Sequence, residues 1–334
     1  MLNAAVIGLG VGLKHAQAYE NHPNCELVAI CDVSSDRLQE CSHSFQGVTA
    51  TTEADSILEN PHVDVVSIAS YDDDHYHQIA KAVRNGKHVF VEKPICLHAE
   101  ELKSIRKLLT MNPGIRLSSN LNLRTCPRFI KLKNEIHSGD MGKLFSIEAD
   151  YLWGRVSKLT DGWRKDMDYY SIILGAAVHM IDLVVWATGR KPILVMGQGN
   201  QIATQGTAMK FNDFATLILT FEDGLVAKIS ANAGCVHPHF HRVAAYGTEK
   251  TFVHEHNRGL MYTSRNHKDQ PHTIEEEYPG ISHKQEMIHS FIDAINNNDA
   301  KPQIEEADVF DTMSICFAAE EAVKTNKAVT IQYI

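Results

Sequence analysis

The sequence has few features that would point to a membrane, a nucleic acid or a secreted protein. Its hydrophobic runs end well short of the roughly 20 residues that a membrane-spanning helix needs. Basic residues are in the minority, and the formal net charge of −9 argues against nucleic acid or an anionic membrane as partner. The N-terminus shows no basic and apolar leader, because Ala4–Ile7 runs directly into a glycine turn.

Cysteine spacing gives no indication of a metal site or a disulfide framework. The 7 cysteines are scattered, without a CxxC pair or zinc spacing, and we expect reduced thiols in a cytoplasmic protein. The segment 237–241, HPHFH, could present alternating histidines to zinc. However, no acidic or cysteine ligand has an obvious spacing, and Pro238 interrupts a regular strand. We predict no metal, and take His237 as a candidate substrate contact.

The chain of 334 residues is long enough for two domains. Its first part alternates short apolar runs with segments of helical period. The expected strands are Ala4–Ile7, Leu27–Cys31, Val63–Ala69, His88–Val91 and Ile115–Leu117, and the expected helices include Leu13–Glu20, His75–Arg84 and Glu100–Leu109. This alternation predicts an α/β domain with a parallel sheet covered by helices, spanning residues 1–119.

Residues 120–334 are expected to form an α+β domain. Helices are predicted near 128–137 and 175–187. The period-two pattern of 191–253, with turn signals at 222–224 and 246–248, predicts a large, mainly antiparallel open sheet. A late helix carries the apolar residues Met287, Ile288, Phe291, Ile292 and Ile295, and a final strand is predicted at Ala328–Ile331.

A glycine turn after the first predicted strand suggests a nucleotide site. Gly8, Gly10 and Gly12 precede a helix, where glycines let the backbone approach a pyrophosphate. A dinucleotide fingerprint would place its third glycine at Leu13. Asp32 ends the second strand, at the distance where a carboxylate binds ribose hydroxyls. No arginine directly follows it, so we predict NAD rather than NADP; the alternative is that Asp32 only caps the helix near Ser34.

A lysine stands at the end of another predicted strand. The segment 75–94 reads as an amphipathic helix, a stop at Gly86, an apolar strand and then Glu92-Lys93-Pro94. Proline fixes its own φ and biases the preceding residue toward extended geometry. Ligands of open α/β sheets bind beyond the carboxyl ends of the strands. Lys93 is therefore a candidate for chemistry, the alternative being a structural lysine that bonds sheet carbonyls.

These motifs resemble the Gfo/Idh/MocA oxidoreductases over essentially the whole chain. The matching pieces are the glycine turn, GKHVFVEKP, NLNLRTCPRF at 120–129, SGDMGKL at 138–144, GAAVHMID at 175–182 and YGTEKTF at 246–252. The resemblance implies a Rossmann dinucleotide-binding domain followed by a domain whose open sheet presents the substrate face and often mediates oligomerisation. A homodimer or homotetramer formed through that sheet is expected.

The resemblance also implies site residues. The family pairs the lysine of EKP with a histidine in a D-x-x-x-H motif; His179 matches the histidine, but Gly175 fills the aspartate position. Catalytic roles are thus implied for Lys93 and His179. The predicted cofactor contacts are Gly8, Gly10, Val11, Gly12, Asp32, Arg37, Ser70, Tyr71, His75, Glu92 and Lys93. The predicted substrate contacts are Arg124, Tyr151, Trp153, Trp163, Arg164, Asp182 and His237.

Alternatives stay open for several of these residues. Asp182, one helical turn after His179, can orient the imidazole, bind substrate or form a helix-surface salt bridge. The aromatic and arginine side chains suit a sugar but could equally be packing residues.

The expected activity is oxidation of a secondary alcohol of a carbohydrate, with His179 accepting the hydroxyl proton while Lys93 polarises the oxygen. The family also contains enzymes that retain their nucleotide and glycosidases that use NAD transiently. The rival from another class is a catalytically silent NAD- or sugar-binding regulatory protein of the same fold.

Overall fold

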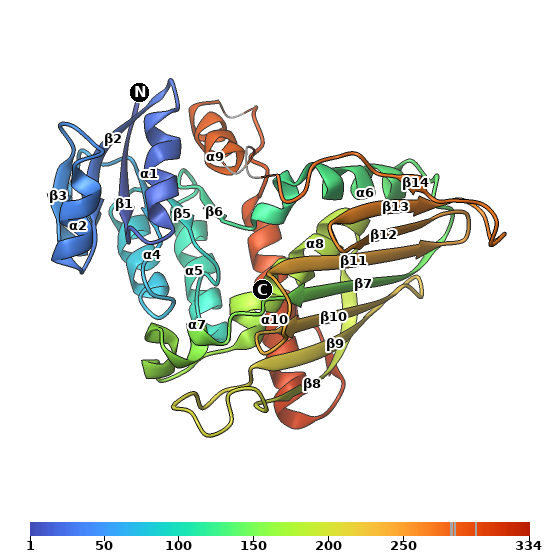
Figure 1. Cartoon of the computed structure of the whole chain (residues 1–334). Helices are drawn as coiled ribbons and strands as arrows, with labels where there is room; N and C mark the ends of the chain where they lie inside the picture. Colours follow the sequence, from blue (N-terminus) through green and yellow to red (C-terminus); the bar gives the residue numbers. More distant parts are fainter. Residues whose placement is uncertain (281–282, 284, 298) are drawn as a thin grey trace. The chain divides into compact units, whose positions relative to one another are not determined.

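The structure is a computed structural model that describes residues 1–280, 283, 285–297 and 299–334 (Figure 1). The chain forms two compact units. The first unit comprises Met1–Leu121, Ser282–Phe310 and Ile334, and the second comprises Asn122–Ile281 and Asp311–Tyr333.

The first unit contains a parallel sheet of 6 strands in the order β3-β2-β1-β4-β5-β6. The strands are β1 (Leu2–Ile7), β2 (Cys25–Cys31), β3 (Thr49–Thr51), β4 (Val65–Ile68), β5 (His88–Val91) and β6 (Leu117–Ser119). The helices are α1 (Gly12–Glu20), α2 (Ser35–Ser42), α3 (Ala54–Leu58), α4 (His75–Arg84) and α5 (Ala99–Met111). The predicted parallel α/β sheet is confirmed. Its strand order reverses between β1 and β4, where open sheets of this kind bind nucleotides.

Two strands of this sheet differ from the prediction. β3 has no counterpart among the expected strands, because it is short and mostly exposed and shows no apolar run. β6 begins at Leu117 rather than at Ile115, since Ile115 N–H closes a turn onto Asn112 O at 2.9 Å.

The first unit also takes up a late helix that the sequence assigned to the second domain. The apolar residues of α9 (Glu286–Asn296) form the predicted stripe, but they pack in the first unit: Phe291 lies 5.8 Å from Phe90 between ring centroids. His289 Nε2 is 3.0 Å from Ala18 O in α1. A single boundary at residue 119 therefore does not describe the division, since an amphipathic stripe does not reveal which sheet it will cover.

The second unit contains a 9-stranded sheet in the order β14-β13-β12-β11-β7-β10-β9-β8-β15. Its strands are β7 (Leu144–Leu152), β8 (Pro192–Asn200), β9 (Phe214–Phe221), β10 (Val226–Asn232), β11 (Phe240–Gly247), β12 (Thr251–Glu255), β13 (Arg258–Tyr262), β14 (His272–Thr273) and β15 (Val329–Thr330). Only β7 and β10 pair in parallel among the described strands of this sheet. The mainly antiparallel prediction is confirmed.

Helices cover one face of this sheet. α6 (Pro127–His137) packs on α8 (Val178–Thr188), and α8 packs on β7 and β10 (Figure 1). α10 (Glu306–Thr325) joins them through Thr312, whose hydroxyl donates to the Asp182 carboxylate at 3.4 Å. In β7, alternate residues such as Ala149 and Tyr151 are buried, as period-two strands with one covered face require.

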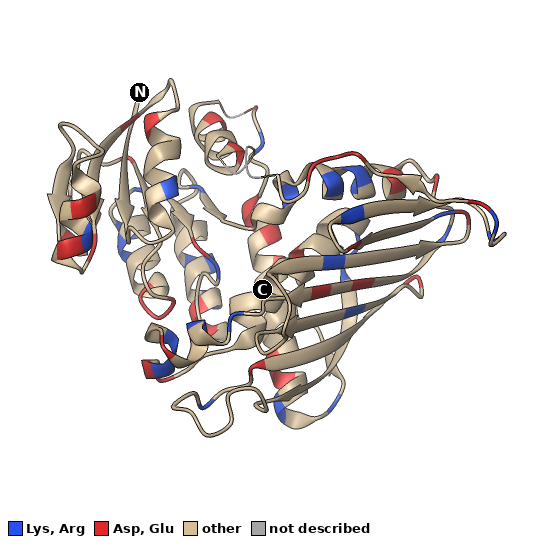
Figure 2. Cartoon of the chain, in the orientation of Figure 1, with Lys and Arg blue, Asp and Glu red and all other residues tan. Residues whose placement is uncertain are grey.

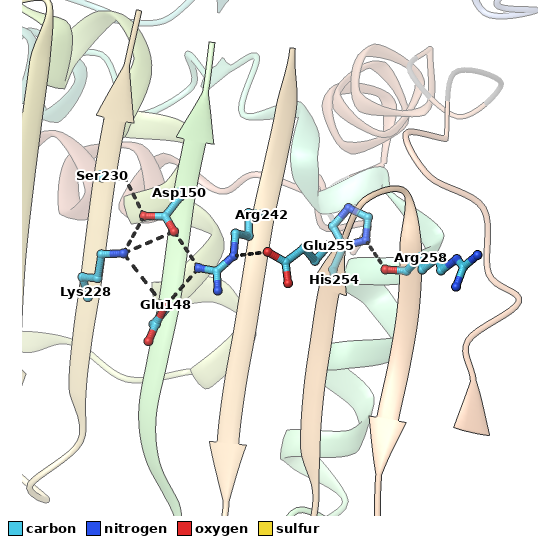
Figure 3. A network of polar contacts seen from close by, with 8 residues as sticks. All are labelled: Glu148, Asp150, Lys228, Ser230, Arg242, His254, Glu255 and Arg258. Atoms are coloured by element: carbon cyan, nitrogen blue, oxygen red, sulfur yellow. Dashed lines mark hydrogen bonds and ion pairs between the residues drawn. The ribbon is translucent and has the colours of Figure 1, made fainter. Parts of the chain in front are cut away.

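The opposite face of the sheet carries an ion-pair network (Figure 3). Arg242 Nη1 lies 2.9 Å from Asp150 Oδ2 and 3.0 Å from Glu148 Oε2, and its Nε lies 3.1 Å from Glu255 Oε1. Burial by itself would raise the pKa of the Asp150 carboxyl, but bonds from Ser230, Lys228 and Arg242 hold that pKa below its ordinary value. Matched charges thus cross the middle strands of the sheet.

Acidic and basic residues lie close to one another along both units (Figure 2). In the part of the chain that the structure describes, no helix is both long and apolar enough to cross a bilayer.

Candidate active site

The glycine turn lies where β1 and β4 end side by side. Gly8 has φ of +87°, and a Cβ there would stand 2.2 Å from Ala69 O, so only glycine fits. A Cβ at Gly10 would meet nothing within 4 Å, which leaves open space beside the turn. A Cβ at Gly12 would stand 2.9 Å from Val6 Cγ1. Gly12 therefore allows α1 to pack closely on β1, the role that a dinucleotide fingerprint gives to a glycine at position 13. The glycine spacing, one residue shorter than in the fingerprint, is compatible with this close packing.

Asp32 fastens this turn to the end of β2. Its carboxylate accepts from Leu9 N–H at 2.7 Å and from Ser34 N–H at 2.9 Å. The N-cap of α2 is Ser34, whose hydroxyl accepts from Arg37 N–H at 3.3 Å. Capping of α2 is therefore not the role of Asp32. A carboxylate has about four lone-pair sites, which leaves acceptor capacity for ribose hydroxyls.

This edge of the sheet fits a dinucleotide. The open space at Gly10, the N–H groups at the start of α1 and the Asp32 carboxylate suit a pyrophosphate and a ribose. Val11 in the glycine turn, Arg37 on α2 and Tyr71 after β4 are exposed, and their predicted contacts with the cofactor stay predictions. The Ser70 hydroxyl donates to Gln78 Oε1 at 2.8 Å.

Lys93 follows β5 at the same edge, half-buried, and the bond to Pro94 is cis. Glu92 beside it accepts from Asn120 Nδ2 at 2.6 Å and lies 3.3 Å from His15 Nε2. Burial by itself would raise the pKa of the Glu92 carboxyl. The bond and charge of His15, followed by the charge of Lys93, outweigh burial and hold that pKa at about 2. Glu92 is thus an ionised neighbour of Lys93.

His75 holds the lysine segment in place. Its imidazole is fully buried, with Nδ1 2.7 Å from Pro94 O and Nε2 3.3 Å from Ser70 O. Carbonyl oxygens only accept hydrogen bonds, so the shorter bond assigns a proton to Nδ1. The contacts described for His75 link the segments that follow β4 and β5, and its predicted contact with the cofactor stays a prediction.

His179 lies near the start of α8 in the second unit and is 8% exposed. A turn of π-helix, Ile173–Ala177, precedes α8, so the predicted helix at 175–187 begins with a local widening. Such bulges frequently mark functional sites. Gly175 lies within it, and a Cβ there would stand 2.7 Å from the hydroxyl oxygen of Tyr170. The buried Tyr170 side chain therefore occupies the space in which an aspartate at 175 would begin.

Gly175→Ala should consequently destabilise the second unit, unlike most glycine-to-alanine changes near a helix. Overpacking costs about 1–3 kcal/mol, which we expect as a lowered midpoint in thermal unfolding. Gly175→Ala made in the Tyr170→Phe background should lower the unfolding midpoint clearly less, because the hydroxyl oxygen that crowds position 175 is absent. Gly114→Ala is the control, since a Cβ there meets nothing within 4 Å. Equal losses in both backgrounds would contradict this account.

Aromatic side chains form a connected group that begins at His179. The Tyr151 ring meets the His179 ring edge-on, with 5.8 Å between centroids. Trp153 stacks beside Tyr151 at 6.5 Å. The Arg164 guanidinium lies over Trp163 at 4.2 Å and over Trp153 at 5.6 Å, as a cation–π pair does. The structure therefore links four of the predicted substrate contacts into one group with His179.

Arg124 and Asp182 form a buried ion pair with each other. Arg124 Nη2 lies 2.6 Å from Asp182 Oδ1, and Asp182 is fully buried. This differs from the helix-surface salt bridge considered above, because the pair joins the segment before α6 to α8 inside the unit. Their predicted contact with substrate stays a prediction, and removing one partner would leave a buried charge.

His237 lines a surface cavity of about 500 Å³ in the second unit. The cavity lies between the segment after β7, with Gly154 and Val156, and the segment that joins β10 to β11. The His237 imidazole Nδ1 lies 2.7 Å from the carbonyl oxygen of Pro238, the next residue in the same turn. Its predicted substrate contact stays a prediction.

Several residues of this region escaped the sequence interpretation. Tyr170, His239, His241 and Tyr278 take part in the surroundings of Tyr151 and Gly175. The alternation of His239 and His241 was the only sign of this arrangement in the sequence. It predicted that both side chains lie on one face of a strand, but it did not predict that Tyr151 is their neighbour.

The parallel sheet and the glycine turn at its switch point define a nucleotide-binding domain, which is joined to a second sheet domain. A family model described as "Oxidoreductase family, NAD-binding Rossmann fold" matches residues 2–118, and "GFO/IDH/MocA C-terminal domain" matches residues 129–253. The chain belongs to the Gfo/Idh/MocA family of oxidoreductases, which confirms the resemblance and the NAD-binding Rossmann domain.

Known relatives extend over most of the chain. The Bacillus subtilis protein "Uncharacterized oxidoreductase YrbE" is 26% identical over 89% of this chain and 87% of its own. Myo-inositol 2-dehydrogenase of Thermotoga maritima is 25% identical over 74% of this chain and 73% of its own. The structure of levoglucosan dehydrogenase in complex with NADH superposes with a TM-score of 0.87 at 21% identity, covering 100% of both chains.

Proposed function

We propose that this protein is an NAD-dependent dehydrogenase that oxidises a secondary alcohol of a carbohydrate, or reduces the corresponding ketone. The substrate would be a sugar, a cyclitol or a nucleotide sugar. The observation that carries the proposal is Lys93 at the carboxyl end of β5, on the same sheet edge as the glycine turn. The relatives named for inositol and levoglucosan support the substrate class.

The proposed chemistry divides between two residues. Bound NAD supplies the acceptor for the hydride that leaves the alcohol carbon. Lys93 donates a hydrogen bond to the reacting oxygen and stabilises the charge that develops on it. His179 accepts the hydroxyl proton as general base. Trp153, Trp163 and Arg164 offer stacking faces and hydrogen-bond donors suited to a sugar ring.

NAD is proposed over NADP because Asp32 directly follows β2 and is 8% exposed. A 2′-phosphate would meet its negative charge. Arg37 is exposed on α2, and we propose for it only a contact with the exposed side of the bound nucleotide.

One observation favours a second candidate, a catalytically silent sugar- or NAD-binding regulatory protein. Position 175 carries no carboxylate, and Tyr170 fills the space where one would begin. Such a protein would bind NAD and show no turnover.

The open face of the second unit's sheet is the surface we propose for contact between copies in a homodimer or homotetramer. Met196, Ile218 and Tyr262 are exposed large apolar residues of its strands, 52%, 39% and 39% exposed. Ile218 pairs with Lys228 of the ion-pair network and Met196 pairs with Ile218, so both side chains lie on the face that carries that network. Light scattering at increasing protein concentration tests this, and a monomer throughout would exclude it.

The function is tested by a panel of sugars, inositols and nucleotide sugars with NAD and with NADP, followed at 340 nm. We expect reduced cofactor in stoichiometric excess over enzyme with at least one polyol class, and a preference for NAD. One equivalent of reduced cofactor without further turnover would indicate an enzyme that retains its nucleotide. Binding of NAD without turnover across the panel would favour the regulatory alternative.

A further inference from the structure

Two of the alternating histidines of residues 237–241, His239 and His241, contact Tyr151. His241 is the direct cross-strand partner of Tyr151 between β11 and β7, and their rings stack at 4.7 Å with 17° between planes. His239 Nε2 lies 2.9 Å from the Tyr151 hydroxyl oxygen. Among the residues that the structure describes, no group of 3 or more His, Cys, Asp or Glu side chains could hold a metal ion. The two histidines thus hold one face of a tyrosine and its hydroxyl.

His241 is itself fixed in place by Tyr278. The Tyr278 hydroxyl accepts from the His241 backbone N–H at 3.0 Å and lies 2.8 Å from His241 Nδ1. The Tyr278 ring packs against His254 at 4.3 Å and against Phe240 at 5.3 Å. The bond to the backbone N–H fixes the Tyr278 hydroxyl on β11, and the bond to Nδ1 would break if the His241 ring turned.

The Tyr151 ring, held in this way, packs against the ring of His179. Tyr151 meets the His179 ring at 87° and 5.8 Å, an edge-to-face arrangement that restricts rotation of the imidazole. Both side chains are buried to more than nine-tenths, at 8% exposure each. Position 175, one turn before His179, is a glycine and offers no side chain for the same purpose.

We propose that Tyr151 is the positioning residue for His179, and that His239 and His241 serve to hold Tyr151. The proposal rests on the proposed function, in which His179 takes the hydroxyl proton. It differs from the predicted role of Tyr151 as a direct substrate contact, because Tyr151 acts here through the imidazole.

The hydrogen bond between His239 and Tyr151 can form whether or not His239 is protonated. Burial raises the pKa of the Tyr151 hydroxyl to about 12, although Arg155 and Arg164 act in the opposite direction. The hydroxyl therefore keeps its proton. It can donate to Nε2 of neutral His239, and it can accept from the same atom when His239 is protonated.

The test compares Tyr151→Phe, His239→Ala and their double variant. Tyr151→Phe keeps the ring and removes the tether, so the imidazole is held less firmly. Since small misplacements of a catalytic group are costly, we expect kcat to fall by about 5- to 100-fold, with KM changed less than about twofold. The double variant should be no slower than the slower single variant, because the two residues share one bond. His239→Gln, whose amide can still bond the hydroxyl, should retain more activity than His239→Ala.

The decisive measurement repeats Tyr151→Phe in the His179→Ala background. If Tyr151 acts through His179, the residual kcat there should not change. An equal fall in both backgrounds, or a rise in KM alone, would overturn the positioning role and indicate a substrate contact or a packing role. Unaltered kcat in Tyr151→Phe would overturn it as well. The general-base role of His179, on which this proposal rests, fails on a different result, namely retention of full activity by His179→Ala. Circular dichroism and thermal unfolding verify that each variant is folded.

Discussion

Lys93→Met is expected to bind NAD and to show no measurable turnover. Methionine keeps much of the length of the side chain but supplies no donor and no charge to the reacting oxygen. Loss of one donor to a developing oxyanion costs about 10²–10³-fold in kcat, and loss of the ammonium charge beside that oxygen adds to the effect. NAD should still bind, because the glycine turn and its Asp32 anchor do not depend on Lys93. Steady-state kinetics and NAD titration measure the two effects separately.

The first unit offers a matched control in Lys87. This lysine is 1% exposed and donates to the carbonyl oxygen of Asn60 and, at 3.0 Å, to that of Val63. It plays the structural role that was the alternative for Lys93, and burial lowers the pKa of its ammonium. Lys87→Met should lower the unfolding midpoint and leave kcat per folded enzyme unchanged. If Lys93→Met behaved like Lys87→Met, with stability lost and turnover kept, Lys93 would be structural.

The first unit could be predicted closely because its signals are local. His88–Val91 and His75–Arg84 match β5 and α4 at both ends, since Gly86 and the Glu92-Lys93-Pro94 segment mark their limits within a few residues. The parallel pairing of the strands followed from their alternation with helices. The same holds for the glycine turn, whose Gly8 has a positive φ directly after a strand.

The surroundings of His179 could not be predicted, because they depend on contacts between distant segments. The bond of Tyr278 to His241 joins residues 37 positions apart, and that of His239 to Tyr151 joins residues 88 apart. The sequence alone showed a glycine at position 175 but not the Tyr170 hydroxyl beside it. Likewise, the Arg124–Asp182 pair spans 58 positions, and neither residue type reveals that it will be buried.

His179→Gln is expected to lower kcat by about 10²–10⁴-fold, the usual contribution of a general base. Glutamine approximates the size and polarity of imidazole but cannot take up the proton of a hydroxyl group. The fall should appear in kcat and in kcat/KM alike, because proton removal occurs in the transition state and not in substrate binding. In the pH dependence of kcat/KM, the limb that reports the essential base should disappear.

His289 provides the control that separates a catalytic histidine from an ordinary helical one. It lies on α9, and its Nε2 is 3.0 Å from Ala18 O, so its hydrogen bonding is satisfied within the first unit. His289→Gln should change stability slightly and leave the pH profile as it is. A loss below about tenfold in His179→Gln would argue against the general-base role. Lys93 would then be the remaining candidate for both proton transfer and polarisation. A pH profile of His179→Gln that keeps the acidic limb of the unaltered enzyme would support that assignment, because an essential base must be deprotonated to act.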